Sequence, residues 1–142
     1  MRTVEKQTGE AVGYLSVKDG ILMIAADGRA LRHAPLEGAG ALRAGKHALF
    51  CADEHGTIWR LNRETLLPEA VFSAGPGVCD LCLSADETRL YALLADANSV
   101  VLLDSQTGRP LLLNGCGCDP RQILLHRGML AAAGGESGCV HL

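Results

Sequence analysis

The sequence lacks any concentration of basic residues: its 13 lysines and arginines are scattered from Arg2 to Arg127, and the formal net charge is −3. Nucleic-acid-binding proteins carry a basic patch or stripe, so this charge pattern predicts no nucleic-acid partner. Long apolar runs are also missing. The longest, ILMIAA at 21–26, is far shorter than the roughly 20 residues of a membrane-spanning helix. We therefore expect no membrane partner either.

A secretory signal is absent as well, since the first residues, MRTVEKQTGEAVGYL, mix charged and polar residues with apolar ones. Without an export signal we expect a cytoplasmic protein, in which thiols stay reduced. The six cysteines are therefore expected to be free. Aromatic residues make up only 4% of the 142 residues, but hydrophobic residues reach 48%, which is sufficient for the packed core of one domain.

What the sequence does contain is an internal repeat of about 40 residues. The segments TIWRLNRET (57–65) and SVVLLDSQT (99–107) share one pattern, and the same offset relates Pro68 to Pro110. Within each unit, short apolar segments alternate with turn signals, which is typical of strands in a meander. A period of about 40–45 residues with four short strands per unit is typical of β-propeller blades.

A helix is the competing interpretation of residues 84–95. Ser84 and Glu87 have the spacing of a helix-capping box, and leucines follow at helical intervals. The aligned stretch LHRGMLAAAGGESG (125–138), however, contains glycines that would interrupt a helix. Because equivalent repeats should share a structure, we expect a strand here and no helix longer than two turns.

The sequence thus predicts an all-β partial propeller built from four-stranded antiparallel meander blades. An irregular short unit would occupy residues 1–45, followed by blade-like units at about 46–77, 78–117 and 118–142. Closed propellers typically have 4–8 blades, so we expect an incomplete ring within one chain.

The stretch GPGVCDLCLSADETRLYALLADANSVVLLDSQTGRPLLLNGCGCDPRQI (75–123) resembles the YVTN-type β-propeller repeat, which is related to the repeats of lactonase-like propellers. The likeness lies in a Gly/Pro-containing lead-in, the LSADETRLY turn, ANSVVLLD, QTG and the second lead-in, DPRQI. It extends over residues 46–142. The resemblance implies a propeller fold and, as an alternative activity, lactone hydrolysis by acidic and polar channel residues with a divalent cation.

Two cysteine pairs, Cys79 with Cys82 and Cys116 with Cys118, are candidates for a metal site. Four thiolates could hold a structural zinc ion. On an extended strand, however, residues 79 and 82 point to opposite faces because side chains alternate with a period of two. We therefore expect structural or free thiols and neither a metal nor another cofactor, with zinc and a redox pair as the alternatives.

The candidate ligand-binding residues lie where the chain leads into the first strand of a blade, which lines the channel of a propeller. They are Cys79 and Asp80 in one unit and Asp119 and Arg121 in the next. These residues could bind a small polar ligand, or they could cap turns and pair with each other, which we favour. The sequence contains no GxSxG, SxxK, HExxH or phosphate-binding glycine motif, so we assign no catalytic residue.

The sequence therefore favours a non-enzymatic scaffold or binding module that presents a loop face to a protein or a small ligand. A lactonase-like hydrolase with a channel-face site is the alternative. An incomplete ring exposes apolar faces and strand edges, which invite another chain. We expect self-association as a homodimer of about six blades, with residues 2–17 beside 139–142 of the same or the other chain, or continuation as part of a longer propeller.

Overall fold

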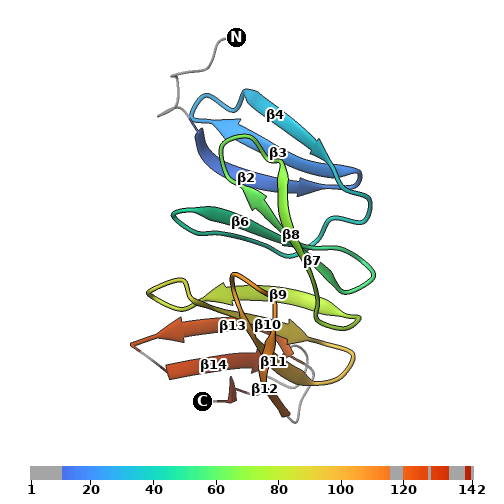
Figure 1. The fold of residues 1–142 in the computed structure, drawn as a ribbon, viewed down its shortest axis with the longest axis vertical. Coiled ribbons are helices and arrows are strands. Elements are labelled where there is room, and N and C mark those ends of the chain that lie inside the picture. Colours follow the sequence, from blue (N-terminus) through green and yellow to red (C-terminus); the bar gives the residue numbers. More distant parts are fainter. Residues whose placement is uncertain (1–10, 116–119, 128, 135–139, 142) are drawn as a thin grey trace.

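The computed structural model describes residues 11–115, 120–127, 129–134 and 140–141, and in these ranges the chain is all β (Figure 1). Four antiparallel sheets follow one another along the chain, each made of consecutive strands that pair in chain order. The first sheet contains β2 (Ala11–Val17), β3 (Gly20–Ala25) and β4 (Ala30–Pro35), and the second contains β5 (Leu42–Ala44), β6 (Ala48–Ala52), β7 (Thr57–Asn62) and β8 (Pro68–Ser73). The third contains β9 (Val78–Leu83), β10 (Arg89–Leu94), β11 (Ser99–Asp104) and β12 (Pro110–Gly115), and the fourth contains β13 (Pro120–His126), β14 (Met129–Gly134) and β15 (Val140–His141).

This architecture confirms the expected all-β fold of antiparallel meanders. The alternative helix at 84–95 is wrong, because a turn and strand β10 occupy these residues. The Ser84 hydroxyl accepts a hydrogen bond from the main-chain N–H of Arg89 at 3.1 Å, which closes the turn. Glu87 has a φ of 62°, a left-handed conformation that cannot continue a right-handed helix. In the described part of the chain, no helix is long and apolar enough to cross a membrane.

The sheets meet through their first strands. Strand β9 lies against both β5 and β13, and β2 lies against β5. In Figure 1 the first sheet lies at the top and the second sheet below it, and the labelled strands of the third and fourth sheets lie together in the lower part of the view. Within one chain the described strands β2 and β15 do not pair with each other, since β2 pairs with β3 and β15 pairs with β14. The expected approach of residues 2–17 to 139–142 is therefore not made by strand pairing in this part of the chain.

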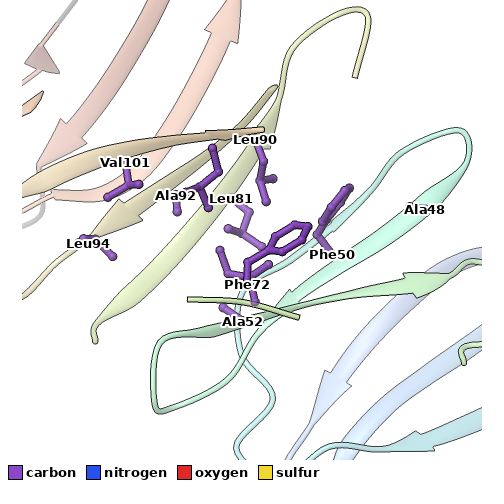
Figure 2. Close-up of a cluster of buried hydrophobic side chains, with 11 residues drawn as sticks. Ala48, Phe50, Ala52, Phe72, Leu81, Leu90, Ala92, Leu94 and Val101 are labelled. Atoms are coloured by element: carbon purple, nitrogen blue, oxygen red, sulfur yellow. The ribbon is translucent and has the colours of Figure 1, made fainter. Parts of the chain in front are cut away.

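The hydrophobic core lies between successive sheets, as strand β6 illustrates. Ala48, Phe50 and Ala52 pack towards the third sheet, whereas Leu49 and Cys51 pack towards the first. Side chains of a strand point alternately to its two faces, so a strand between two sheets is buried along its whole length. In Figure 2, Phe50 and Phe72 meet Leu81 and Leu90 of the third sheet, and the two aromatic rings lie 6.5 Å apart.

The turns between strands repeat the same chemistry. The side-chain oxygen Oδ1 of Asn62 accepts hydrogen bonds from the main-chain N–H groups two and three residues further on, at 2.8 and 2.9 Å. Asp104, the matching residue of the next unit, makes the same two bonds at 2.8 and 3.0 Å. This correspondence supports the repeat seen in the sequence.

Candidate channel-face site

Asp80 lies on β9 and links the third sheet to both of its neighbours. Its Oδ2 atom accepts a hydrogen bond from the main-chain N–H of Ile123 on β13 at 2.8 Å. Its Oδ1 atom lies 3.9 Å from Nη2 of Arg43 on β5 and accepts a hydrogen bond from the N–H of Leu81 at 3.0 Å. Both carboxylate oxygens are therefore engaged by groups of the protein itself.

Arg43 strengthens the same connection and is absent from the residues predicted from the sequence. Its Nε atom donates to the carbonyl oxygen of Leu81 at 2.8 Å, so the guanidinium holds both the main chain and a carboxylate of the next sheet. Its position in the repeat could have indicated this role. Arg43 lies on the first strand of its sheet, as Asp80 does, and carries the opposite charge.

Cys79 occupies a β-bulge in β9. Leu93 on β10 pairs with Asp80, but the next residue, Leu94, pairs with Val78, so Cys79 is the extra residue. The expectation that Cys79 and Cys82 face opposite sides is therefore wrong, because both pack into the cluster between the third and fourth sheets. A bulge inserts one residue and reverses the alternation beyond it.

The Cys79 thiol donates a weak hydrogen bond to the carbonyl oxygen of Pro120, with 3.7 Å between sulfur and oxygen. Burial, followed by the negative charge of Asp80, raises the pKa of the Cys79 thiol, while the positive charge of Arg121 opposes this shift. The thiol is therefore protonated at neutral pH, which makes it a weak nucleophile.

Arg121 lies on β13 with an exposed side chain, and its positive charge favours the thiolate form of Cys79 and so lowers the pKa of that thiol. The structure thus brings Cys79, Asp80 and Arg121 together, whereas Asp119 lies outside the described residues. Cys116 and Cys118 also lie outside them. Among the residues that are described, no group of three or more histidine, cysteine, aspartate or glutamate side chains could hold a metal ion.

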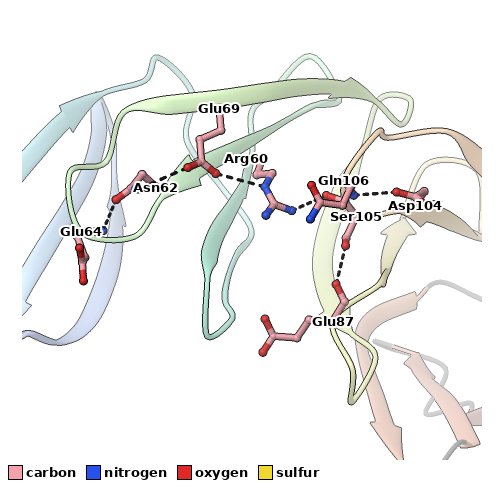
Figure 3. A network of polar contacts seen from close by, with 8 residues as sticks. All are labelled: Arg60, Asn62, Glu64, Glu69, Glu87, Asp104, Ser105 and Gln106. Atoms are coloured by element: carbon pink, nitrogen blue, oxygen red, sulfur yellow. Dashed lines mark hydrogen bonds and ion pairs between the residues drawn. The ribbon is translucent and has the colours of Figure 1, made fainter.

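A second polar link joins the second and third sheets at Arg60 of β7 (Figure 3). Its Nη1 atom donates to the carbonyl oxygen of Ser105 at 2.7 Å, and its Nε atom lies 3.3 Å from Oε1 of Glu69. The guanidinium also lies over the ring of Phe50, 5.4 Å from its centre. The Ser105 hydroxyl in turn donates to the carbonyl oxygen of Glu87 at 2.5 Å. Like Asp80, Arg60 uses its polar atoms to hold neighbouring sheets together.

No family model and no curated protein matches the chain. Solved structures do match. A chain of the crystal structure of the Mitotic Checkpoint Complex aligns with a TM-score of 0.74 and 18% identity, over 88% of this chain and 42% of that one. The β-propeller domain of Myceliophteria thermophila Cps50 (Swd1) aligns with a TM-score of 0.62 and 19% identity, over 70% and 33% of the two chains.

The computationally designed Ika4 protein aligns with a TM-score of 0.69 and 16% identity, over 90% of this chain and 86% of that one. This chain spans less than half the length of the checkpoint and Cps50 chains. Likeness at this level of identity concerns the fold alone, and propellers host many unrelated functions. The YVTN-type, lactonase-related assignment finds no support in these matches. Four meandering sheets that meet through their first strands, together with these alignments, show a β-propeller fold whose ring is incomplete in this chain.

Proposed function

We propose that the chain is a non-enzymatic β-propeller module that binds protein, and that its two terminal sheets complete the ring with a second copy. The observation that carries this proposal is the exposure of Leu124 on β13. Leu124 is 64% exposed, whereas Cys82, which occupies the matching position of the preceding unit, is 7% exposed. The fourth sheet covers Cys82, and no described sheet covers Leu124.

The opposite end of the molecule offers a similar surface. Leu15 on β2 pairs with Leu22 on β3 and is 52% exposed, while Ile21 and Met23 of the same hairpin pack against the second sheet. Each end thus presents half of the contact that successive sheets make inside the molecule. A second copy supplies both missing halves at once, because each chain carries one surface of each kind.

Two chains of four sheets would form a ring of eight blades, more than the six expected from the sequence and within the 4–8 of closed propellers. The expected contact between residues 2–17 and 139–142 would then lie between copies. Asp80 does not support the lactonase alternative, because its carboxylate oxygens already contact Ile123, Leu81 and Arg43.

Light scattering after size-exclusion chromatography at micromolar concentration tests the proposal. The wild-type chain should have about twice its 14.9 kDa mass. Leu124→Lys should weaken the dimer by at least about tenfold, because a buried cation would be unpaired. Leu67→Lys is the matched control, since Leu67 is also 64% exposed but lies in the turn between β7 and β8. A wild-type monomer, or equal effects of both substitutions, would contradict the proposal.

A further inference from the structure

Met129 is the exposed one of the two methionines that the structure describes. The sequence contains three methionines, of which Met1 lies outside the described residues. Met23 is 5% exposed and packs in the core between the first and second sheets, whereas Met129 is 57% exposed at the start of β14. An oxidant in solution can therefore reach the thioether of Met129, while burial shields that of Met23.

Met129 lies on the same face of the fourth sheet as Leu124. Leu130, the next residue, pairs with Leu125 and packs towards the third sheet. Because side chains alternate along a strand, Met129 points to the opposite face. Leu124 also points there, since its neighbour Ile123 packs towards the third sheet. None of the described sheets covers this face, which is the one proposed to contact the second copy.

Leu124 and Met129 are also close neighbours in the sheet. Leu124 pairs with Ala131 and Met129 pairs with His126, so Met129 lies diagonally across the strand pair from Leu124. Diagonal neighbours of this kind are about 7–8 Å apart, which long side chains can span. The thioether of Met129 therefore belongs to the apolar surface around Leu124.

We propose that Met129 is a site of reversible oxidation that controls the association of two copies, a role that rests on the proposed ring completion. A peroxide transfers one oxygen atom to the sulfur of Met129. The O–O bond of the peroxide breaks and an S=O bond forms, so the thioether is oxidised to a sulfoxide and hydrogen peroxide is reduced to water.

The sulfoxide changes the chemistry of the surface around Leu124. It is polar, and burial of a polar group without a hydrogen-bond partner is unfavourable, so oxidation should separate the two copies. Methionine sulfoxide reductases reverse the step. A dithiol supplies the electrons, is itself oxidised to a disulfide, and the oxygen atom leaves as water.

The described thiols are poorer targets for the same oxidant. Burial raises the pKa values of the Cys51 and Cys79 thiols and keeps them protonated at neutral pH. Peroxides react with the thiolate form. Cys82 is buried. Oxidation in the described part of the chain should therefore start at Met129.

Titration with hydrogen peroxide tests the proposal. Peptide mapping by mass spectrometry measures the sulfoxide at each methionine, and light scattering after size-exclusion chromatography measures the mass of the same samples. We expect Met129 to be oxidised before Met23, and complete oxidation of Met129 to weaken the dimer by at least about tenfold. A methionine sulfoxide reductase with dithiothreitol should restore the dimer. Oxidation of Met129 should slow as the protein concentration rises, because association covers the thioether.

Two substitutions separate Met129 from the other oxidisable residues. Met129→Leu keeps an apolar side chain and all six cysteines but removes the sulfur, so it should form the dimer and not respond to peroxide. Met129→Gln introduces a polar side chain of similar length and should weaken the dimer without peroxide. Circular dichroism checks that both variants and the oxidised wild type remain folded.

Three results would overturn the oxidation site and leave ring completion intact: a dimer that survives complete oxidation of Met129, equal responses of the wild type and Met129→Leu to peroxide, or oxidation of Met23 as fast as that of Met129. A wild-type chain that is monomeric before any peroxide is added would instead contradict ring completion itself, and with it the control by Met129.

Discussion

The carboxylate of Asp80 and the main-chain N–H of Ile123, 43 residues apart in the sequence, are joined by a hydrogen bond of 2.8 Å. The two residues lie on the first strands of neighbouring sheets, which share no backbone ladder. Apart from the weak hydrogen bond between Cys79 and Pro120, the contacts between these sheets described above are apolar. This bond therefore fixes how the two strands are aligned. Apolar contacts alone would fix the alignment less strictly, because they have no preferred direction.

Removal of this link should destabilise the fold. We expect Asp80→Ala to lower the free energy of unfolding by about 1–3 kcal/mol, because the N–H of Ile123 loses its acceptor. Asp80→Asn retains an acceptor oxygen and should cost less. Urea denaturation measures both, with the exposed loop residue Glu37 as the control. A loss from Asp80→Ala no larger than that from Glu37→Ala would contradict the structural role.

Arg60 should contribute more to the free energy of unfolding than its ion pair with Glu69 alone would. Its side chain is only 13% exposed, and it donates to Ser105 and covers Phe50. We expect Arg60→Ala to cost about 2 kcal/mol, whereas Glu69→Gln should cost below about 1 kcal/mol because Glu69 is more exposed. Thermal and urea unfolding of the two variants can be compared directly. Equal losses would mean that the ion pair, and not the contact with the third sheet, carries the effect.

Acid should destabilise the protein in a defined pH range. Hydrogen bonds from the main-chain N–H of Thr88 and then the hydroxyl of Ser84 lower the pKa of Asp86 from 3.8 to about 2. Because the folded pKa lies below the unfolded one, the stabilisation is present above about pH 4 and is lost as the pH falls towards about 2. Turn hydrogen bonds likewise lower the pKa of Asp104.

Urea midpoints measured from pH 6 to pH 2 test this acid dependence. Asp86→Asn removes the titrating group, so the stability of this variant should fall less steeply below pH 4 than that of the wild type. A parallel decline of the two proteins would mean that other carboxylates cause the acid sensitivity.

Two glycines with positive φ allow the cost of backbone strain to be compared with the cost of a steric clash. Gly28 has a φ of 88° and open space around it, so Gly28→Ala should cost about 1 kcal/mol from the left-handed backbone alone. Gly108 has a φ of 74°, but a Cβ atom there would fall on the buried ring of Phe72. Gly108→Ala should therefore cost about 1–3 kcal/mol more than Gly28→Ala. Equal losses in urea denaturation would argue against the contact between Gly108 and Phe72.

The cysteines should not need a metal. We expect less than one zinc ion per chain after dialysis, measured by elemental analysis, and an unchanged melting temperature on addition of EDTA. A structural zinc site contributes folding energy directly, so its removal would lower the melting temperature. Stoichiometric zinc together with melting in EDTA would instead indicate Cys79, Cys82, Cys116 and Cys118 as ligands.

The fold could be predicted because it depends on features that the sequence repeats. Asn62 and Asp104 make the same turn at the same place in two units, so each occurrence supports the other. The helix alternative at 84–95 depended on one unit alone, and the left-handed Glu87 shows that the Ser84–Glu87 spacing there serves a turn.

The candidate site was less predictable because it depends on contacts between units. The bulge at Cys79 shifts side chains by one residue without any change in composition, so alternation misplaced Cys79 relative to Cys82. The approach of Arg43 to Asp80 follows from the packing of successive first strands, which the pattern within one unit does not contain.

The burial of β6 on both faces has a consequence for cooperativity. Each internal sheet owes its stability to two neighbours, so the molecule resembles a one-dimensional array in which each unit is coupled to the adjacent ones. A terminal sheet packs against one neighbouring sheet instead of two. Local unfolding should therefore start at the terminal sheets and proceed inwards. The second and third sheets, which share the cluster around Phe50 and Leu90, form the part of the described chain that opens last.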